Sequence, residues 1–385
     1  MHDAALDAYA AGLAAVDPTV LVRKAVRQGW LDDWLIPPGT KREEPKRIRV
    51  LALGKAAPRM LWGLVEAGVP FAGLGVAPKG VHAPNVDTFT WLPGDHPLPG
   101  PGSFTAGAAV LNWIDALAPD EPVLVLLSGG ASACAEVPHG ISPEALRTKW
   151  ETLLRSGLPI DAMNRERSAL SALKGGKLGQ RLLARTRRAR VWLLADTERA
   201  LAPQIVGSGP FHVPGEPDAI PHRVLAGTEE MIAAAGLRLA TLGYEVHRHG
   251  RRVAGDAESE VAAFLAAAKG LPGRPAALVG GGECSVSLPV GTPPGGRCQH
   301  AAVFAAKWLA EDADASSAFL CVASDGVDGS TDAAGALVSA GDWTPEAAAA
   351  LEGHAAHALL DRRGRLIHMG ATGTNVNDLW IALRP

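Results

Sequence analysis

The stretch Val123-Leu124-Val125-Leu126-Leu127-Ser128-Gly129-Gly130-Ala131-Ser132-Ala133 joins a wholly apolar run to a turn that contains two glycines. The apolar run predicts a buried strand, and the small residues after the glycines are compatible with the start of a helix. Glycines let a backbone approach an anion, and a helix N-terminus supplies N–H donors, to which Ser128 and Ser132 add hydroxyl groups. The stretch therefore predicts a strand, a loop and a helix, with an anion site at Ser128, Gly129, Gly130 and Ser132. A tight turn with a serine cap is the alternative.

Short apolar runs of this kind alternate with Ala-rich amphipathic stretches along the chain, which is typical of a layered α/β fold with largely parallel strands. Helix start signals stand at Ser103, at Ser142-Pro143 and at Thr344-Pro345. We expect strands at 47–53, 74–77, 88–92, 123–127 and 191–195 in a first sheet, and at 244–247, 277–279, 284–288, 318–323 and 380–383 in a second series.

With 385 residues the chain exceeds the usual size of a single core, so two domains are expected. The segment 209–221 is rich in proline and glycine, and a helix-like stretch, 224–242, follows it. We therefore expect an N-terminal domain over 1–235 and a C-terminal domain over 236–385.

The formal net charge of −3 and the apolar share of 47% are ordinary for a globular protein. They argue against a dedicated partner of nucleic acid or of membrane surfaces and favour small-molecule ligands. The chain opens without a cationic segment that leads into a long apolar run, which favours the cytoplasm. The four cysteines lack CxxC spacing, so we expect buried free thiols and neither a zinc site nor a disulfide framework.

Three charged residues follow glycine turns or strand ends. Lys55 comes directly after the first predicted strand, where an ammonium group could bridge phosphate oxygens. Asp196 follows the run 191–195 and could serve as a general base or a metal ligand. Arg297 begins an Ala-rich helix after two glycines and could clamp a carboxylate or phosphate. For each of these residues taken alone, a solvated side chain or an ordinary turn is the alternative to a functional role.

Gly280-Gly281-Gly282-Glu283 is expected to follow a strand, and close approach of the backbone to a ligand would explain three successive glycines. Two polar loops near the C-terminus, 324–332 and 370–378, flank apolar runs in the same way. Their carboxylates, hydroxyls and amides could hold a metal ion or a polyol. Ordinary turns are the alternative for each loop.

Several common motifs are missing from the sequence. Neither G-x-x-x-x-G-K-[ST] nor a G-x-G-x-x-G after a strand occurs, which disfavours Walker-type NTPases and conventional dinucleotide binding. No G-x-S-x-G elbow occurs, which disfavours a serine hydrolase.

In their order along the chain, these loops resemble the class II glycerate kinases, whose C-terminal part is called MOFRL and which have been confused with hydroxypyruvate reductases. The resemblance covers nearly the whole chain. It rests on Gly54-Lys55-Ala56-Ala57, His96-Pro97-Leu98-Pro99, Ser128 to Ala133, Leu170 to Leu178, Gly207-Ser208-Gly209-Pro210, Gly281-Gly282-Glu283, Gly296-Arg297, Ser324 to Ala336 and Thr372 to Asp378.

The resemblance implies a Rossmann-like N-terminal domain, a smaller α/β MOFRL-type C-terminal domain, an interdomain cleft, and ATP- and Mg²⁺-dependent phosphorylation of D-glycerate to 2-phosphoglycerate. Lys55 and Arg297 match the essential lysine and arginine of the family, and Asp196 would accept or orient the proton of the substrate hydroxyl. Asp325 and Asp328 would hold Mg²⁺. A homodimer is a candidate assembly. Substrate and nucleotide would be bound by Ser128, Gly129, Gly130, Ser132, Lys174, Gly281, Gly282, Glu283, Thr374 and Asn375.

The chain departs from the family pattern at a few positions. Cys298 and His300 stand where an asparagine and a glutamate are usual, Ala169 replaces a common histidine, and Gly100 replaces a common aspartate. Two other functions stay open at this point. One is an oxidoreductase that acts on hydroxypyruvate, and the other is a non-catalytic sensor of a carboxylate or nucleotide.

Overall fold

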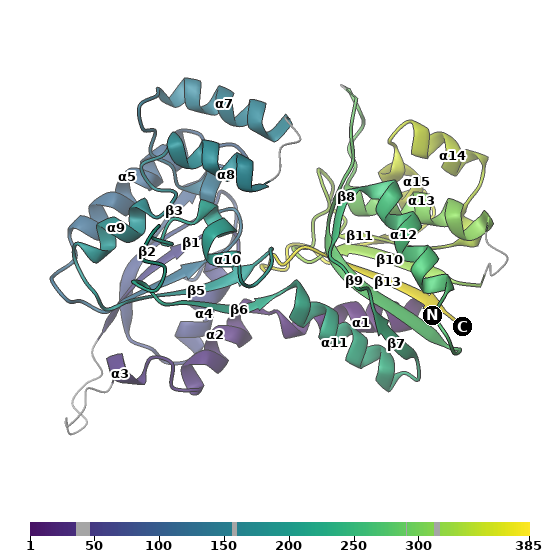
Figure 1. The fold of residues 1–385 in the computed structure, drawn as a ribbon, viewed down its shortest axis with the longest axis horizontal. Helices are drawn as coiled ribbons and strands as arrows, with labels where there is room; N and C mark the ends of the chain where they lie inside the picture. Colours follow the sequence, from purple (N-terminus) through teal and green to yellow (C-terminus); the bar gives the residue numbers. More distant parts are fainter. Residues whose placement is uncertain (36–46, 156–159, 290, 312–315) are drawn as a thin grey trace. The chain divides into compact units, whose positions relative to one another are not determined.

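The computed structural model describes residues 1–35, 47–155, 160–289, 291–311 and 316–385, which form two compact units (Figure 1). The Rossmann-like unit contains Asp17–Gly227 and Gly373–Asn375, and the C-terminal unit contains Met1–Val16, Thr228–Thr372 and Val376–Pro385. These units differ from the expected domains 1–235 and 236–385 in two respects. The first 16 residues join the C-terminal unit, and position 235 lies inside the helix α11 (Thr228–Thr241).

The Rossmann-like unit is built on a six-stranded sheet in the order β3-β2-β1-β4-β5-β6, and all of its strand pairs are parallel. The strands are β1 (Ile48–Leu53), β2 (Phe71–Pro78), β3 (Phe89–Gly94), β4 (Val123–Leu127), β5 (Ala189–Ala195) and β6 (His222–Gly227). The chain proceeds outward from β1 in one direction and from β4 in the other. In such doubly wound sheets, ligands bind beyond the carboxyl ends of the strands at the point where the order reverses.

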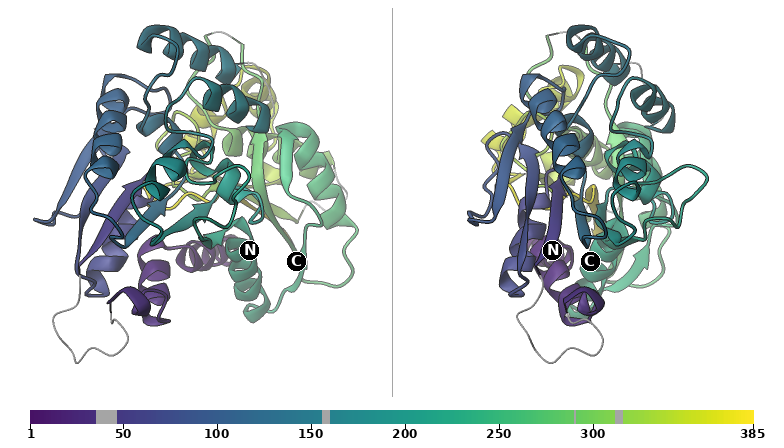
Figure 2. Two further views of the ribbon diagram at one scale, coloured as in Figure 1. Left: turned by 60° about the vertical axis from the view of Figure 1, so that its left-hand side comes forward. Right: turned by 90° about the vertical axis from the view of Figure 1, so that its left-hand side faces the viewer.

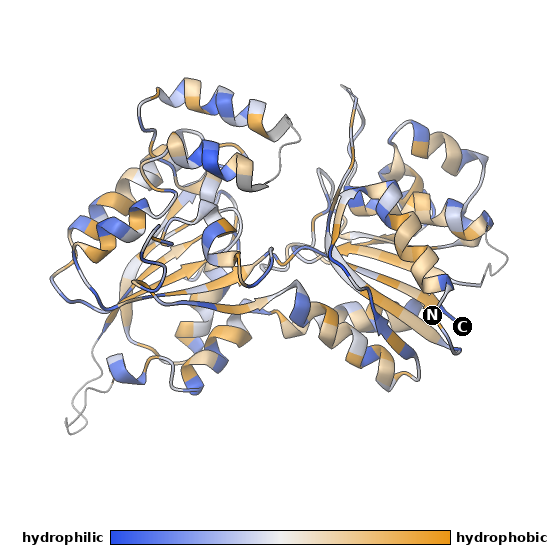
Figure 3. Ribbon diagram, viewed as in Figure 1, coloured by the Kyte–Doolittle hydropathy of each residue, from blue (hydrophilic) through white to orange (hydrophobic). Residues whose placement is uncertain are grey.

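The helices of this unit are α2 (Pro18–Arg27), α3 (Asp32–Leu35), α4 (Ala57–Glu66), α5 (Pro101–Asp115), α6 (Ala131–Cys134), α7 (Pro143–Arg155), α8 (Ile160–Ala169), α9 (Lys177–Leu183), α10 (Ala202–Ile205) and the 3₁₀ turn Val206–Ser208. Helices α5 and α9 cover one face of the sheet, where Val110 and Leu182 share a core with Leu51 and Val125. Helix α4 packs on the sheet from the other side (Figure 1). Strand β4 is apolar along its whole length, and β1 and β5 are apolar except for Arg49 and Arg190 near their starts, as burial on both faces requires (Figure 3).

The C-terminal unit contains a sheet in the order β12-β11-β10-β13-β9-β7, with β8 paired to β9. Its strands are β7 (Glu245–Arg248), β8 (Val253–Asp256), β9 (Ala276–Ser285), β10 (Ala318–Ala323), β11 (Gly335–Ser339), β12 (Leu366–Ile367) and β13 (Asp378–Arg384). Only β7 and β8 run parallel to β9, and the other pairs are antiparallel. The expectation of largely parallel strands is therefore wrong for this sheet. A buried apolar run has the same pattern in either direction, so the sequence does not reveal strand direction.

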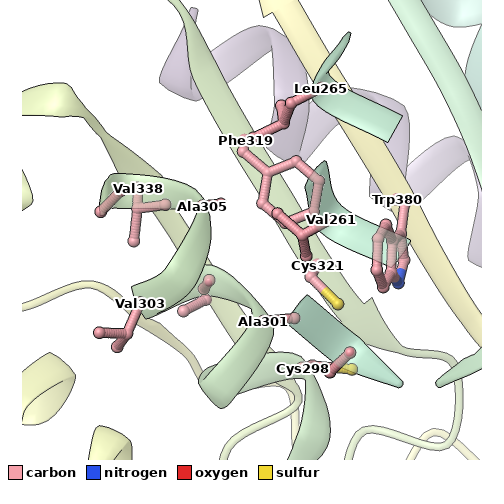
Figure 4. Close-up of a cluster of buried hydrophobic side chains, with 14 of the residues drawn as sticks. Val261, Leu265, Cys298, Ala301, Val303, Ala305, Phe319, Cys321, Val338 and Trp380 are labelled. Atoms are coloured by element: carbon pink, nitrogen blue, oxygen red, sulfur yellow. The ribbon is translucent and has the colours of Figure 1, made fainter. Parts of the chain in front are cut away.

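Helices cover both faces of this second sheet. They are α1 (His2–Ala15), α11, α12 (Ala257–Lys269), α13 (Arg297–Glu311), the 3₁₀ turn Ala340–Asp342, α14 (Pro345–Glu352) and α15 (Ala356–Arg362). On one face, Phe264 of α12 meets Phe319 and Trp380 edge to face, with ring centroids 6.0 and 5.5 Å away. Phe319 and Trp380 belong to the buried cluster drawn in Figure 4. On the other face α11 lies against the sheet, and α1 packs alongside α11 (Figures 1 and 2).

Most predicted elements of the first sheet are confirmed to within a few residues. The Ser142 and Thr344 hydroxyls accept the backbone N–H groups of Ala145 and Ala347, so two of the three predicted helix caps are present. The start predicted at Ser103 is wrong, because α5 begins at Pro101. The strand expected at 284–288 is wrong, because β9 is one strand that ends at Ser285. Strands β6, β8, β11 and β12 were not expected, and β6 occupies the beginning of the stretch predicted as helix over 224–242.

All four cysteines are free and buried, as expected. Burial raises the pKa of the Cys134 thiol to about 12 and that of Cys321 to about 11. Among the described residues, no single helix is long and apolar enough to cross a membrane, although α1 and α2 pass that test when they are combined.

Candidate functional site

The loops after β1 and β4 are tied together at the point where the strand order reverses. The backbone N–H of Lys55 donates to the carbonyl of Gly129 at 2.9 Å, and the N–H of Ala56 donates to Ser128 Oγ at 3.0 Å. Gly54 has φ 113°, and a Cβ there would lie 2.5 Å from both the carbonyl and hydroxyl oxygens of Ser128. Ser128 therefore fixes the loop that carries Lys55, and its hydroxyl is committed to the backbone.

Gly129 and Gly130 lie directly beneath three polar side chains. A Cβ on Gly129 would lie 2.8 Å from both Asp196 Oδ2 and Asn375 Nδ2, and one on Gly130, with φ 84°, would lie 2.9 Å from Lys55 Cγ. The fold thus gathers Lys55, Asp196 and Asn375, which are far apart in the sequence, around Gly129-Gly130. Any side chain at position 129 would displace the carboxylate and the amide.

His96 also belongs to this group, although sequence reasoning did not count it among the site residues. It follows β3 and is exposed, and its Cδ2 would lie 3.4 Å from a Cβ on Gly130. The available signal was the motif His96-Pro97-Leu98-Pro99, which lies directly beyond a strand end. Strand ends of a parallel sheet meet at one edge, so this position could have been recognised from the strand order.

Ser132 takes part in a hydroxyl network beside these two glycines. Its Oγ lies 2.8 Å from Ser208 Oγ, which in turn donates to Asn164 Oδ1 at 2.9 Å. Ser208 has φ 63° and stands between Gly207 and Gly209, whose φ angles are 64° and 58°. A left-handed serine is strained, and such strain persists only where the surroundings enforce it. The network holds Ser132 in a defined rotamer at the start of α6.

The side chain of Lys174 is buried and is not exposed to solvent at this site. The side chain is 1% exposed, and its Nζ pairs with Glu136, a carboxylate that is itself fully buried. Glu136 Oε1 accepts a hydrogen bond from Ser171 Oγ at 2.5 Å. Burial lowers the pKa of Lys174, and Glu136 offsets part of that effect. The sequence revealed a lysine in a glycine-rich motif but not its burial, and the binding role of Lys174 stays a prediction.

A pocket of about 630 Å³ opens next to Ser208 in the same unit. Its lining includes Asn164, Arg165, Ser168 and Ala169. Ala169 is therefore a pocket-lining residue, and a histidine at that position would occupy part of the cavity. The departure from the family pattern at 169 changes a surface that a ligand could contact.

The C-terminal unit carries Arg297 at the first position of α13. Its Nε and Nη2 donate to Oδ2 and Oδ1 of Asp378 at 2.7 and 2.8 Å, and its Nη1 lies 2.8 Å from Glu283 Oε1. Burial alone would lower the pKa of Arg297, but Asp378 and Glu283 raise it overall, so the guanidinium stays charged. Burial raises the pKa of Asp378 to about 6, against the opposing effect of Arg297. Asp378 was part of a quoted motif, yet its role as the anchor of Arg297 was not foreseen.

Asp328 and Asp325 lie in the predicted loop after β10 but differ in their contacts. Both oxygens of Asp328 accept backbone N–H groups at the start of α13, from Cys298 at 3.1 Å and Gln299 at 2.9 Å. Asp325 is half-buried, and its Oδ1 accepts the N–H of Val327. Within the described residues, no group of three or more histidine, cysteine, aspartate or glutamate side chains could hold a metal ion. Asp328 is thus engaged as a helix cap, and the role of Asp325 as a metal ligand stays a prediction.

The glycines at 280–282 were expected to follow a strand. This expectation is wrong, because they lie within β9. A Cβ on Gly281 would lie 2.6 Å from the carbonyl of Asp378 and 2.8 Å from Thr228 Cγ2, and a Cβ on Gly280 would lie 2.7 Å from Phe264. Packing inside the unit therefore explains these glycines without a ligand. The binding roles of Gly281 and Gly282 stay predictions, while exposed Glu283 contacts Arg297.

The two departures after Arg297 have different environments. Cys298 is fully buried in the core, and its thiol is a hydrogen-bond partner of Cys321 (Figure 4). His300 lines a second pocket, and its Nε2 lies 3.2 Å from Glu258 Oε1. Only His300 can meet a ligand directly.

The fold and these loops define a doubly wound α/β protein with two glycine-lined loops at a strand edge in one unit and a guanidinium held by two carboxylates in the other. A family model described as a domain of unknown function, DUF4147, matches residues 4–229, and the MOFRL family model matches residues 276–378.

The D-glycerate 2-kinase of Thermotoga maritima is 30% identical to this chain, over 88% of this chain and 90% of that protein. A glycerate 2-kinase of Pyrococcus horikoshii is 27% identical, over 96% and 94%. The crystal structure of glycerate kinase from Thermotoga maritima matches with a TM-score of 0.81 at 25% identity, over 100% of this chain and 99% of that one. The chain belongs to this family of glycerate 2-kinases, which confirms the resemblance stated from its motifs.

Proposed function

We propose that this protein transfers the γ-phosphoryl group of ATP to the 2-hydroxyl of D-glycerate, giving 2-phosphoglycerate and ADP. The observation that carries the proposal is the convergence of Lys55 and Asp196 on Gly129-Gly130, at the reversal point of the sheet, in a chain of this family. Phosphoryl transfer requires positioning and charge stabilisation more than covalent chemistry, and these residues supply both.

In the proposed reaction the 2-hydroxyl oxygen attacks the γ-phosphorus while the bond to the β,γ-bridging oxygen breaks. Asp196 takes the hydroxyl proton, and ADP leaves with the electron pair of the broken bond. The Lys55 ammonium and the Arg297 guanidinium stabilise the negative charge on the transferring group. Asp378 and Glu283 hold the guanidinium plane in one orientation, which removes the cost of ordering it during the reaction.

Mg²⁺ is proposed as the metal ion, held by Asp325 together with phosphate oxygens of ATP, since Mg²⁺ usually binds one or two carboxylates plus substrate phosphates. When bound, it would neutralise phosphate charge. Asp328 supports the same loop from the helix side. The Ser324 hydroxyl, which accepts the N–H of Val376 at 2.8 Å, holds the base of the loop.

The remaining binding residues have supporting roles in this proposal. The backbone of Gly129 and Gly130 faces the anion, Ser132 and Asn375 orient the acceptor, and buried Thr374 fixes the segment that carries Asn375. We also propose a cytoplasmic enzyme with small-molecule ligands, without nucleic-acid or membrane partners, for which a homodimer is the candidate assembly.

The test is a panel of hydroxy acids and sugar acids incubated with ATP and Mg²⁺, with release of ADP as the readout. We expect D-glycerate to give the highest kcat/KM and the product to be the 2-phosphate by ³¹P NMR. Oxidation of NADH with hydroxypyruvate would instead favour an oxidoreductase. Calorimetric binding of glycerate or ATP without any turnover would favour a sensor.

A further inference from the structure

A second cavity, of about 520 Å³, lies in the C-terminal unit and includes Arg297 in its lining. Leu288, Pro293 and Pro294 give it an apolar surface, and His300 and His354 add two imidazole rings. Pockets for organic ligands commonly have volumes of 300 to 1,000 Å³, with mostly apolar linings and a few polar groups. This cavity has the size and composition of such a site.

The two imidazoles form a preorganised aromatic pair in the lining of the cavity. Their ring centroids lie 5.4 Å apart with an interplanar angle of 21°, so the rings are stacked. Glu258 contacts Nε2 of His300, and the backbone of His354 is fixed in the left-handed region at φ 51°, just after α14. A ligand that stacks against rings already held in place does not have to order them on binding.

The chemistry of this lining selects a planar group that carries an anion. Aromatic and proline surfaces suit a heteroaromatic base, whereas a three-carbon hydroxy acid would leave the apolar surface uncovered. Three of the five guanidinium N–H groups of Arg297 are used by Asp378 and Glu283. Two remain to meet phosphate oxygens.

We propose that this cavity binds the base of the nucleoside triphosphate, with the stacked pair of His300 and His354 as its aromatic wall and Arg297 as the boundary towards the phosphates. The inference rests on the proposed function for the role of ATP as phosphoryl donor. It assigns to His300, the residue that departs from the family pattern, a contact with the nucleotide and none with glycerate.

The decisive variant is Ser330→Trp, which fills the cavity from an exposed position of its lining. Val327→Trp is the matched control, because Val327 is 40% exposed in the same loop and does not line the cavity. Calorimetry on the full chain measures Kd for ADP and, in parallel, for inorganic pyrophosphate, which lacks the nucleoside. We expect Ser330→Trp to weaken ADP binding roughly tenfold or more while pyrophosphate binding changes less than about twofold, with Val327→Trp like the wild type.

His354→Asn provides an independent variant, since asparagine tolerates the left-handed backbone while the ring is lost. It should also weaken ADP selectively. Unchanged ADP affinity in folded Ser330→Trp and His354→Asn would overturn the proposal that the base binds in this cavity. Equal weakening of ADP and pyrophosphate binding would also overturn it, because that result would indicate a phosphate site. If the cavity variants weaken ADP binding selectively but the wild type phosphorylates no glycerate, the proposed function is wrong and the proposed base site is supported. If the wild type phosphorylates glycerate and both variants have the wild-type KM for ATP, the proposed base site is wrong and the proposed function is supported.

Discussion

Arg297 and Asp378 form a two-pronged ion pair, with Nε to Oδ2 at 2.7 Å and Nη2 to Oδ1 at 2.8 Å. Asp378 is fully buried at the first position of β13, so the pair joins the start of α13 to the centre of the sheet. Such a fork depends on the planar guanidinium, which an ammonium group cannot imitate.

Arg297→Lys should therefore fail to preserve function. We expect kcat to fall at least tenfold, because one donor cannot satisfy both oxygens of Asp378 and also face the phosphoryl group. Stability should fall as well, by about 1 to 3 kcal/mol, since a buried carboxylate oxygen loses its partner. Urea unfolding and steady-state kinetics measure the two effects separately. A folded lysine variant with wild-type kcat would show that the fork is dispensable.

Lys55→Ala tests the charge contact in the Rossmann-like unit. The contact should strengthen in the transition state, so kcat should fall far more than KM for glycerate rises. The expected loss is about 3 kcal/mol, roughly a hundredfold in rate. The backbone N–H of Lys55, which alanine keeps, donates to the carbonyl of Gly129, so the melting temperature should change little. Near-normal kcat in this variant would remove Lys55 from the mechanism.

Asp325 and Asp328 should separate into a metal ligand and a structural cap. EDTA should abolish turnover, and Mg²⁺ or Mn²⁺ should restore it. Asp325→Asn should raise the Mg²⁺ concentration for half-maximal rate with little loss of stability. Asp328→Asn should cost about 1 to 2 kcal/mol of unfolding free energy through the lost helix cap. Full activity after exhaustive chelation, or an unchanged Mg²⁺ requirement in Asp325→Asn, would contradict this assignment.

Cys298 and His300 should respond differently to replacement. Cys298→Ser should keep most activity and lose stability, because it adds a hydroxyl to a packed core. His300→Glu should change KM for the nucleotide. The double change Cys298→Asn with His300→Glu, which restores the family pattern, should alter preference among nucleotides. If Cys298→Ser abolishes turnover in a folded protein, direct transfer without an enzyme thiol is the wrong mechanism.

Lys174 and Glu136 should behave as a coupled buried pair. Lys174→Met or Glu136→Gln alone should destabilise the protein by about 3 to 5 kcal/mol, because either change leaves one buried polar partner uncompensated. The double variant should recover much of this loss. A double-mutant cycle from chemical denaturation measures the coupling. Additive losses would show that the two side chains do not act as a pair, and a selective rise in KM for ATP without destabilisation would return Lys174 to the ligand site.

The sequence by itself determined the local elements and the loops that carry charge. Apolar runs that end at Leu53, Leu127 and Ala195 identified three strand ends, and the residues after them, Lys55, Ser128 and Asp196, are neighbours in the folded sheet. These features depend on patterns a few residues long, such as burial of a run, a glycine turn or a capping hydroxyl. The ordered set of motifs also identified the family.

Only the tertiary structure decided which distant residues meet and which are withdrawn from solvent. It placed Asn375 beside Gly129, joined Met1–Val16 to the C-terminal unit, paired Lys174 with Glu136 in the core, and enclosed the glycines at 280–282 between neighbouring strands and helices. None of these features has a local signature. Contacts between segments far apart in the chain set strand direction, the burial of a charge and the close approach of backbones. These contacts contribute free energy only when the sheets and their covering helices assemble.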